Sequence, residues 1–247
     1  MKKFNGYTGG AVTVTLDSQG DDSLRPGVSK EKWTKQLVAS LGSVSQDIVI
    51  DFATVSMGEK IASGGGGQVF VARWRNTEVV VKEPFWFAGT ASQDLINEIQ
   101  MLAELEHPNV VQFMGACIKA PEKPVILEEY VDGPNLESFL SNRRGNKLER
   151  RTIYGWSLDL LRALDFLHNR NPIIIHRDLK PANLLLTRDL TMLKLTDFGM
   201  SKKVDRSQRD SKQHKGYTGT VRYMAPEVIS QRTGNYNEKC DIYSASL

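Results

Sequence analysis

One polar segment, set among short apolar runs, constrains this 247-residue chain more than any other. Residues 175–183 read Ile-His-Arg-Asp-Leu-Lys-Pro-Ala-Asn, and three leucines follow directly. A second apolar run, residues 193–196, leads into Asp197-Phe198-Gly199. Phosphoryl transfer to an alcohol depends on positioning and charge neutralisation, so it needs an Asp that accepts a hydroxyl proton and oxygen ligands for Mg²⁺. The two segments therefore predict a catalytic loop and, after a second strand, a further carboxylate for the metal.

The chain has a strand-rich part followed by a helical part. Short β-branched runs bounded by turn residues predict a small sheet between about residues 50 and 82, with further strands at 110–113 and 125–130. Apolar residues at helical spacing predict helices over residues 92–105, 136–142 and 151–168. Residues 1–50 are rich in Gly, Ser, Thr and Asp, and we expect a flexible extension with a short helix at 31–41.

Composition excludes several classes of function. The chain is 40% hydrophobic and 25% charged, like a soluble globular protein. It has no apolar run of ~18 residues and no signal sequence, and a net charge of +3 is too small to indicate nucleic-acid binding. Cys117 and Cys240 stand far apart without a Cys/His cluster, which argues against zinc and disulfides. We therefore expect a cytoplasmic protein with no nucleic-acid partner and no membrane span.

The two polar segments give the sequence a resemblance to eukaryotic protein kinases that begins near residue 55 and reaches the last residue. The resemblance implies an α+β, two-lobed fold. Its β-rich N-lobe would span residues 51–128, and the hinge and a partial helical C-lobe would span 129–247. Asp241 would anchor the backbone turn at His176 and Arg177. Because the chain stops at Leu247, soon after the start of what resembles the central C-lobe helix, the resemblance implies a C-terminally incomplete domain.

Carried over residue by residue, the resemblance implies ATP and Mg²⁺ as cofactors. It makes Asp178 the catalytic base and places Lys180 on the γ-phosphate, with Asn183 and Asp197 as metal ligands. Phe198 would stack with His176 in a spine between the lobes. The residues that it places around the nucleotide are Ala62, Gly64, Gly67, Val69, Val80, Lys82, Glu98, Glu129, Val131 and Leu185.

Within that set, Lys82 would bind the α- and β-phosphates and Glu98 would be its ion-pair partner. The glycine-rich loop departs from the family pattern because Ala62 stands at the first glycine position. Glycines at 65 and 66 should make the loop tip more mobile than usual.

The hinge allows two alignments. If residues 129–131 contact adenine, Glu128 stands at the gatekeeper position behind it, where an unpaired carboxylate would be costly to bury. Either Glu128 reaches Lys82 or another donor, or the alignment shifts by one residue and Leu127 is the gatekeeper. The sequence favours Glu128 only slightly.

Lys180 and Thr220 resemble the serine/threonine class, and residues 107–117 and 223–227 resemble the tyrosine kinase-like, Raf-like group. The implied function is transfer of the ATP γ-phosphoryl group to Ser/Thr of a protein substrate in intracellular signalling. An upstream kinase could act on the activation segment at Ser207, Ser211, Tyr217 or Thr218, where Arg177 would bind the phosphate. The alternative is a nucleotide-binding pseudokinase, or an inactive fragment, that acts through binding.

Overall fold

The computed structural model describes residues 48–64, 67–84, 98–117, 125–143, 145, 147–205, 219–230 and 236–247. Most of the expected N-terminal extension, its short helix, the tip of the glycine-rich loop and the four candidate phosphorylation sites lie outside these residues. No helix in the described ranges is both long enough and apolar enough to span a membrane.

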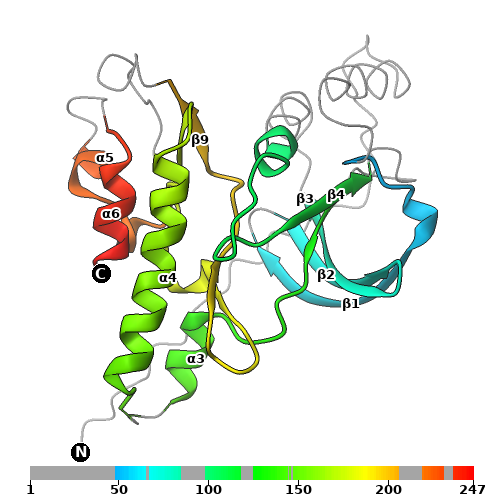
Figure 1. The fold of residues 1–247 in the computed structure, drawn as a ribbon, viewed down its shortest axis with the longest axis horizontal. Helices are drawn as coiled ribbons and strands as arrows, with labels where there is room; N and C mark the ends of the chain where they lie inside the picture. Colours follow the sequence, from blue (N-terminus) through cyan, green and yellow to red (C-terminus); the bar gives the residue numbers. More distant parts are fainter. Residues whose placement is uncertain are drawn as a thin grey trace, which may run out of the picture.

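Within the described residues, the first part of the chain forms a five-stranded antiparallel sheet with the strand order β1-β2-β3-β5-β4 (Figure 1). The strands are β1 (Val55–Gly64), β2 (Gly67–Trp74), β3 (Thr77–Pro84), β4 (Phe113–Cys117) and β5 (Val125–Glu129). A short 3₁₀ helix, η2 (Phe52–Thr54), precedes β1 and is capped by the Asp51 side chain, which accepts a hydrogen bond from the Ala53 N–H.

The two faces of the sheet differ in chemistry because side chains alternate along each strand. One face buries Val79, Val81 and Leu127 against Ile50 and Val55 in a small core of its own. Residues 80 and 82 of β3 and residues 126 and 128 of β5 belong to the opposite face. This alternation explains why only half of each apolar run enters the small core.

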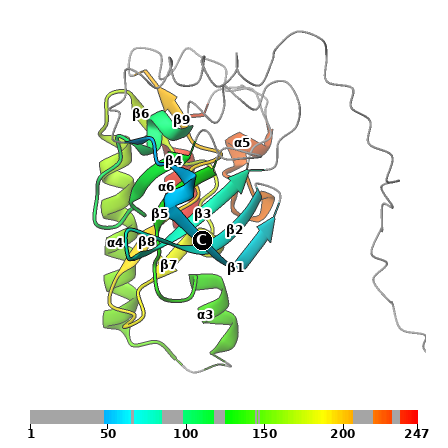
Figure 2. The ribbon, with the colours of Figure 1, turned by 90° about the vertical axis from the view of Figure 1, so that its right-hand side faces the viewer.

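The second part of the chain is mainly helical and lies beside the sheet (Figures 1 and 2). Its helices are α3 (Leu136–Asn142), α4 (Arg150–His168), α5 (Pro226–Ser230) and α6 (Lys239–Ala245), with 3₁₀ turns η3 (Pro181–Asn183) and η5 (Val221–Tyr223). Two short antiparallel pairs lie against α4: β6 (Ile173–Ile175) with β9 (Lys202–Val204), and β7 (Leu184–Leu186) with β8 (Leu193–Leu195).

A single hydrophobic core joins the two parts. Residues 156, 160, 164 and 167 of α4 are buried, at the spacing that places them on one helical face. They share a core with Phe113 and Ile126 of the sheet and with Phe198. Four large apolar residues of α4 are not covered in this way: Ile153 is 44% exposed, Tyr154 69%, Leu158 47% and Leu161 50%. The buried stripe thus fixes α4 against the β7–β8 hairpin.

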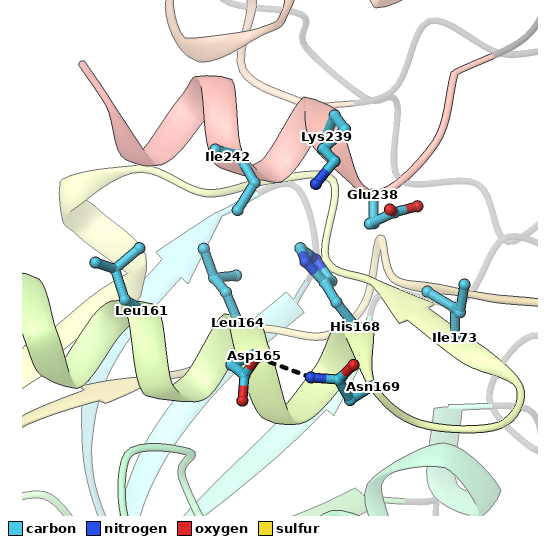
Figure 3. A pocket seen from close by; sticks show the side chains of 9 residues that line it. All are labelled: Leu161, Leu164, Asp165, His168, Asn169, Ile173, Glu238, Lys239 and Ile242. Atoms are coloured by element: carbon cyan, nitrogen blue, oxygen red, sulfur yellow. Dashed lines mark hydrogen bonds between the residues drawn. The ribbon is translucent and has the colours of Figure 1, made fainter.

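A cavity of about 560 Å³ lies between α4 and α6 (Figure 3). Apolar residues of α4 form one wall, and Glu238 and Lys239 stand at the start of α6 on the other side. Its floor includes Asp165, which accepts a hydrogen bond from the Asn169 side chain. None of the predicted site residues lines this cavity.

Most predicted elements are confirmed, but two boundaries were wrong. The strand expected at residues 110–113 begins at Phe113 instead; Val110 and Val111 run beside Leu195 of β8, where the Val111 N–H donates to the Leu195 carbonyl at 2.9 Å. Of the helix expected over 92–105, residues 92–97 lie outside the described part of the chain, residues 98–102 are helical, and the continuation tightens into turns through 105. Both segments lie between β3 and β4 in the chain, and they pack Leu102, Leu105 and Val110 into the core that the sheet shares with the helical part.

Asp241 anchors the polar loop to α6, as expected. Its side chain is buried, at 1% exposure. One carboxylate oxygen accepts the His176 N–H at 2.8 Å and lies 2.9 Å from His168 Nε2, and the other accepts the Arg177 N–H at 2.9 Å. Arg177 has φ of 68°, a left-handed conformation that is strained for a non-glycine residue. The carboxylate therefore holds the loop in a shape that its own sequence does not favour.

We expect Asp241→Ala to lower the free energy of unfolding by about 3 kcal/mol, because it strands two buried N–H groups. Urea denaturation followed by circular dichroism measures the change. Asp132→Ala is the control: it removes an exposed ion pair with Arg188 and should change stability by less than about 1 kcal/mol. Equal losses in the two variants would contradict the anchoring role.

Candidate active site

The loop between β6 and β7 gathers polar side chains around Asp178, which is 6% exposed. Its Oδ2 accepts hydrogen bonds from Lys180 Nζ at 2.6 Å and Asn183 Nδ2 at 3.2 Å. Its Oδ1 accepts from both the Thr220 N–H and the Thr220 hydroxyl, each at 2.9 Å. Lys180 also donates to Thr220 Oγ1 at 3.1 Å. These donors hold the carboxylate in one orientation, and its oxygens are suited to accept a proton.

Gly219 makes the approach of Thr220 to Asp178 possible. Its φ is 115°, a region that side chains other than hydrogen rarely allow. A Cβ at this position would lie 2.5 Å from the Arg177 carbonyl oxygen. The sequence identified Thr220 only as a marker of substrate class, and the structure shows that it also binds the predicted base.

The residues expected to bind metal offer the oxygen atoms that Mg²⁺ prefers. Asn183 is buried and uses its amide nitrogen on the Asp178 carbonyl at 2.8 Å, which leaves its amide oxygen to offer to a cation. Asp197 is exposed and has φ of 68°. In the described ranges, no three His, Cys, Asp or Glu side chains gather as a metal cage. Two protein oxygens completed by phosphates and water suit Mg²⁺, so the donor set fits this ion.

Lys82 of β3 forms its ion pair with Glu128, and the pair expected with Glu98 does not form. Lys82 Nζ lies 2.9 Å and 2.8 Å from the two Glu128 carboxylate oxygens, and 3.4 Å from Thr196 Oγ1. Glu128 stands diagonally across from Lys82 on the neighbouring strand, so no helix movement is needed to bring the two together. This confirms that Glu128 reaches Lys82, which was the condition for placing it behind the adenine.

Without that ion pair, Glu98 keeps its proton more readily. Burial raises the pKa of Glu98 from an ordinary 4.5 to about 7; Lys82 opposes this rise, whereas Glu128 and Asp197 add to it. The pKa of Lys82 is raised as well: burial alone would lower it, but the attraction of Glu128 and then Asp197 outweighs that effect. Lys82 is therefore surrounded by three acidic residues, Glu128, Asp197 and Glu98.

The hinge strand is tied to the strand that precedes Asp197. Glu129 Oε1 accepts from Lys194 Nζ of β8 at 2.6 Å and from the Gln112 N–H at 2.8 Å. The side chain of Glu129 thus serves the structure, and so does its N–H, which donates to the Gln112 carbonyl at 2.9 Å. Val131 is half-buried two residues further on, and its carbonyl accepts the Gly133 N–H at 2.9 Å.

Four of the other predicted nucleotide residues lie in the hairpin of β1 and β2, and the remaining two lie on β3 and β7. Ala62 of β1 pairs with Val69 of β2, which in turn pairs with Lys82. Gly64 pairs with Gly67 at the turn end of this hairpin. The remaining two are half-buried: Val80 of β3, opposite Glu128, and Leu185 of β7. Ala62 and Val69 are therefore in register with Lys82 across the first three strands.

The packing predicted between the lobes is confirmed. The rings of His176 and Phe198 meet edge to face, with centroids 5.0 Å apart. Phe198 shares a buried core with Leu102 and Phe113. His176 is fully buried and its Nε2 lies 3.0 Å from the Thr196 carbonyl oxygen, and burial lowers its pKa. It is a structural histidine beside the site.

Arg177 faces the chain that follows Asp197. Its guanidinium donates to the Met200 carbonyl oxygen and to the Tyr236 hydroxyl, the latter at 3.2 Å. The expected phosphate acceptors near it, residues 207–218, lie outside the described part of the chain.

The sheet carrying Lys82, the helical part carrying Asp178 and the short hinge between them define the two-lobed, α+β protein kinase class, as expected. Residues 55–247 match the family described as the protein kinase domain, and the chain belongs to this family.

Three relatives illustrate the match. Serine/threonine-protein kinase VIK of Arabidopsis thaliana is 38% identical over 204 residues, which are 80% of this chain and 44% of that protein. Serine/threonine-protein kinase CTR1 of the same organism is 33% identical over 206 residues, 83% of this chain and 24% of that protein. Mitogen-activated protein kinase kinase kinase 10 of Homo sapiens is 32% identical over 207 residues, 79% of this chain and 20% of that protein.

The chain spans less than half the length of each of these relatives. They are consistent with the tyrosine kinase-like, Raf-like group that the sequence indicated.

The pKa of Glu98 predicts a pH dependence of stability. Between pH 4.5 and about 7 the folded chain binds more protons at Glu98 than the unfolded chain does, so stability falls as the pH rises through this range. Urea unfolding at pH 5 and pH 7.5 should therefore show a smaller difference in Glu98→Gln than in the parent. Glu137→Gln, on exposed α3 surface, is the control and should follow the parent. An unchanged pH dependence in Glu98→Gln would show that this carboxyl titrates normally.

Proposed function

We propose that this chain is a serine/threonine protein kinase domain that transfers the γ-phosphoryl group of ATP to a protein hydroxyl. The observation that carries the proposal is the geometry around Asp178, whose carboxylate is held by Lys180, Asn183 and Thr220 at 2.6 to 3.2 Å. A positioned carboxylate of this kind can accept the proton of an incoming Ser or Thr hydroxyl.

The other residues neutralise and orient the phosphates. Lys180 lies close enough to Asp178 to contact the phosphoryl group in transfer, and Asn183 and Asp197 supply oxygens for Mg²⁺. Bound Mg²⁺ would neutralise charge on the phosphate oxygens. From the sheet, Lys82 would contact the α- and β-phosphates. The backbone of Glu129 and Val131 would contact the adenine, which would lie between Val69, Val80 and Leu185. The hairpin that contains Ala62, Gly64 and Gly67 would cover the phosphates. Each of these roles follows from the family resemblance together with the placement of the residue.

The proposed setting is a cytoplasmic kinase cascade. One relative bears the name mitogen-activated protein kinase kinase kinase, which supports a protein substrate that is itself a kinase. Arg177, already oriented toward the segment that follows Asp197, supports control by an upstream kinase through phosphorylation of that segment.

A pseudokinase that only binds nucleotide is the competing proposal. The departures at Ala62 and Glu128 from the usual pattern motivate it. Against it, Lys82 retains a carboxylate partner, and the base and both metal ligands are present. Catalysis is therefore the better supported function.

Replacing Asp178 with Asn should lower phosphotransfer by about 10²- to 10⁴-fold, because the amide cannot accept the hydroxyl proton. Lys82→Met should give a loss of similar order by removing charge from the phosphate site. Transfer of labelled phosphate from Mg²⁺·ATP to a generic protein substrate measures both. Asp165→Asn and Lys147→Met, on exposed surface, are matched controls. Parent-level rates in Asp178→Asn would refute the assigned base.

The contact between Thr220 and Asp178 predicts the acceptor class. Phosphoamino-acid analysis of the labelled product should give phosphoserine and phosphothreonine, because Thr220 and Lys180 together shape the side of the base that a hydroxyl approaches. Predominant phosphotyrosine would reverse this assignment.

A further inference from the structure

The partner of Lys82 is unusual in where it comes from. Glu128 belongs to β5 and is 3% exposed, and both of its carboxylate oxygens lie within 2.9 Å of Lys82 Nζ. Thr196 completes the group: its hydroxyl accepts from Lys82 at 3.4 Å and lies 3.5 Å from Glu128 Oε2. Because Thr196 directly precedes Asp197, this group places the lysine beside the predicted metal ligand.

The register of the sheet fixes the distance between the two charges. Lys82 pairs with Ile126, and Glu128 pairs with Val80. Lys82 and Glu128 are therefore diagonal neighbours on one face of an antiparallel pair, within reach of long side chains. Their separation depends on the hydrogen bonds between β3 and β5 and not on the position of the helix at residues 98–102.

The energetics favour keeping this ion pair in the presence of nucleotide. A carboxylate as deeply buried as that of Glu128 is costly to leave without a cation, because a broken buried ion pair leaves an uncompensated charge away from water. An ammonium group has three N–H donors, so Lys82 can keep its carboxylate partner and still donate to a phosphate oxygen. Glu98, half-buried and with its pKa raised to about 7, is the weaker competitor for the lysine at neutral pH.

We propose that Glu128 is the positioning residue for Lys82, so that the phosphate-binding lysine of this chain is anchored within the sheet rather than by the helix that carries Glu98. This inference rests on the proposed kinase function and deepens it. The inference adds that the orientation of Lys82 does not depend on the placement of the helix that carries Glu98. That helix therefore makes a secondary contribution to nucleotide binding.

The test compares two variants that each remove one charge and keep the shape of the side chain, Glu128→Gln and Glu98→Gln. The first readout is the rate at which Lys82 reacts with a water-soluble acylating reagent at pH 7.5 in the absence of nucleotide, followed by peptide mass spectrometry. Losing its anchor should make Lys82 react several-fold faster in Glu128→Gln, with a smaller change in Glu98→Gln. Glu129→Gln is the matched control: it removes the adjacent carboxylate, which binds Lys194 instead, and should leave the Lys82 rate as in the parent.

The second readout is phosphotransfer, separated into KM for ATP and kcat. We expect Glu128→Gln to raise KM for ATP and to lower kcat/KM by about a hundredfold, and Glu98→Gln to lower kcat/KM by less than about tenfold. Glu128→Asp, which restores the charge on a shorter side chain, should recover part of the loss and part of the protection from acylation. Urea unfolding of each variant identifies any that does not fold, and in that case Glu128→Asp supplies the comparison with the parent.

Two results would overturn the proposal. Faster acylation in Glu98→Gln than in Glu128→Gln would make Glu98 the anchor. A lower KM and a higher kcat/KM in Glu128→Gln would show that Glu128 withholds Lys82 from the phosphates. If the parent chain transfers no phosphate, the proposed function fails, while the acylation rates still identify the partner of Lys82.

Discussion

The carboxylate of Asp241 is the contact on which the rest of the site depends. It accepts the consecutive N–H groups of His176 and Arg177 and also lies against His168 at the end of α4. The end of α4 and the loop at His176 and Arg177 are joined in this way to a residue more than 60 positions further along the chain, through one buried side chain. The bonds hold the strained backbone of Arg177, and the next residue is the predicted base. Everything that gathers around Asp178 therefore depends on a residue that would never touch substrate.

Features determined by local chemistry could be predicted from the sequence. The β7–β8 hairpin and α4 appear where the sequence placed them because each buries apolar residues in the shared core, and α3 packs the half-buried Leu136 and Phe139 against that core. The segment at residues 110–113 was misassigned for the opposite reason. Its β-branched residues look like a strand, yet Val110 and Val111 run beside β8 in the other part of the chain, a contact set by the tertiary fold. Local patterns cannot distinguish strand partners that lie 80 residues away.

The same limit explains the site. The motifs predict Asp178, Asn183 and Asp197 as site residues, and the relative positions of these residues depend on a few adjoining turns. The resemblance assigned Glu98 as the ion-pair partner of Lys82, and this was wrong because the partner depends on which residue of β5 stands diagonal to Lys82 and on where the helix at 98–102 lies. The sequence left open whether Glu128 reaches Lys82, and the register of two neighbouring strands decided it. The sequence identified Thr220 only as a marker of substrate class. Its contact with Asp178 could not be predicted, because that contact depends on the close approach made at Gly219.

The bonds around Glu129 also determine where the two lobes can move against each other. This residue is held three times over: its N–H donates to the Gln112 carbonyl, and its carboxylate accepts from the Gln112 N–H and from Lys194. Gly133 is confined too, since a Cβ there would lie 2.2 Å from the Leu186 carbonyl oxygen. Rotation between the lobes is therefore restricted to residues 130–132, the three residues between these points. The connection is a short hinge that is held at both ends.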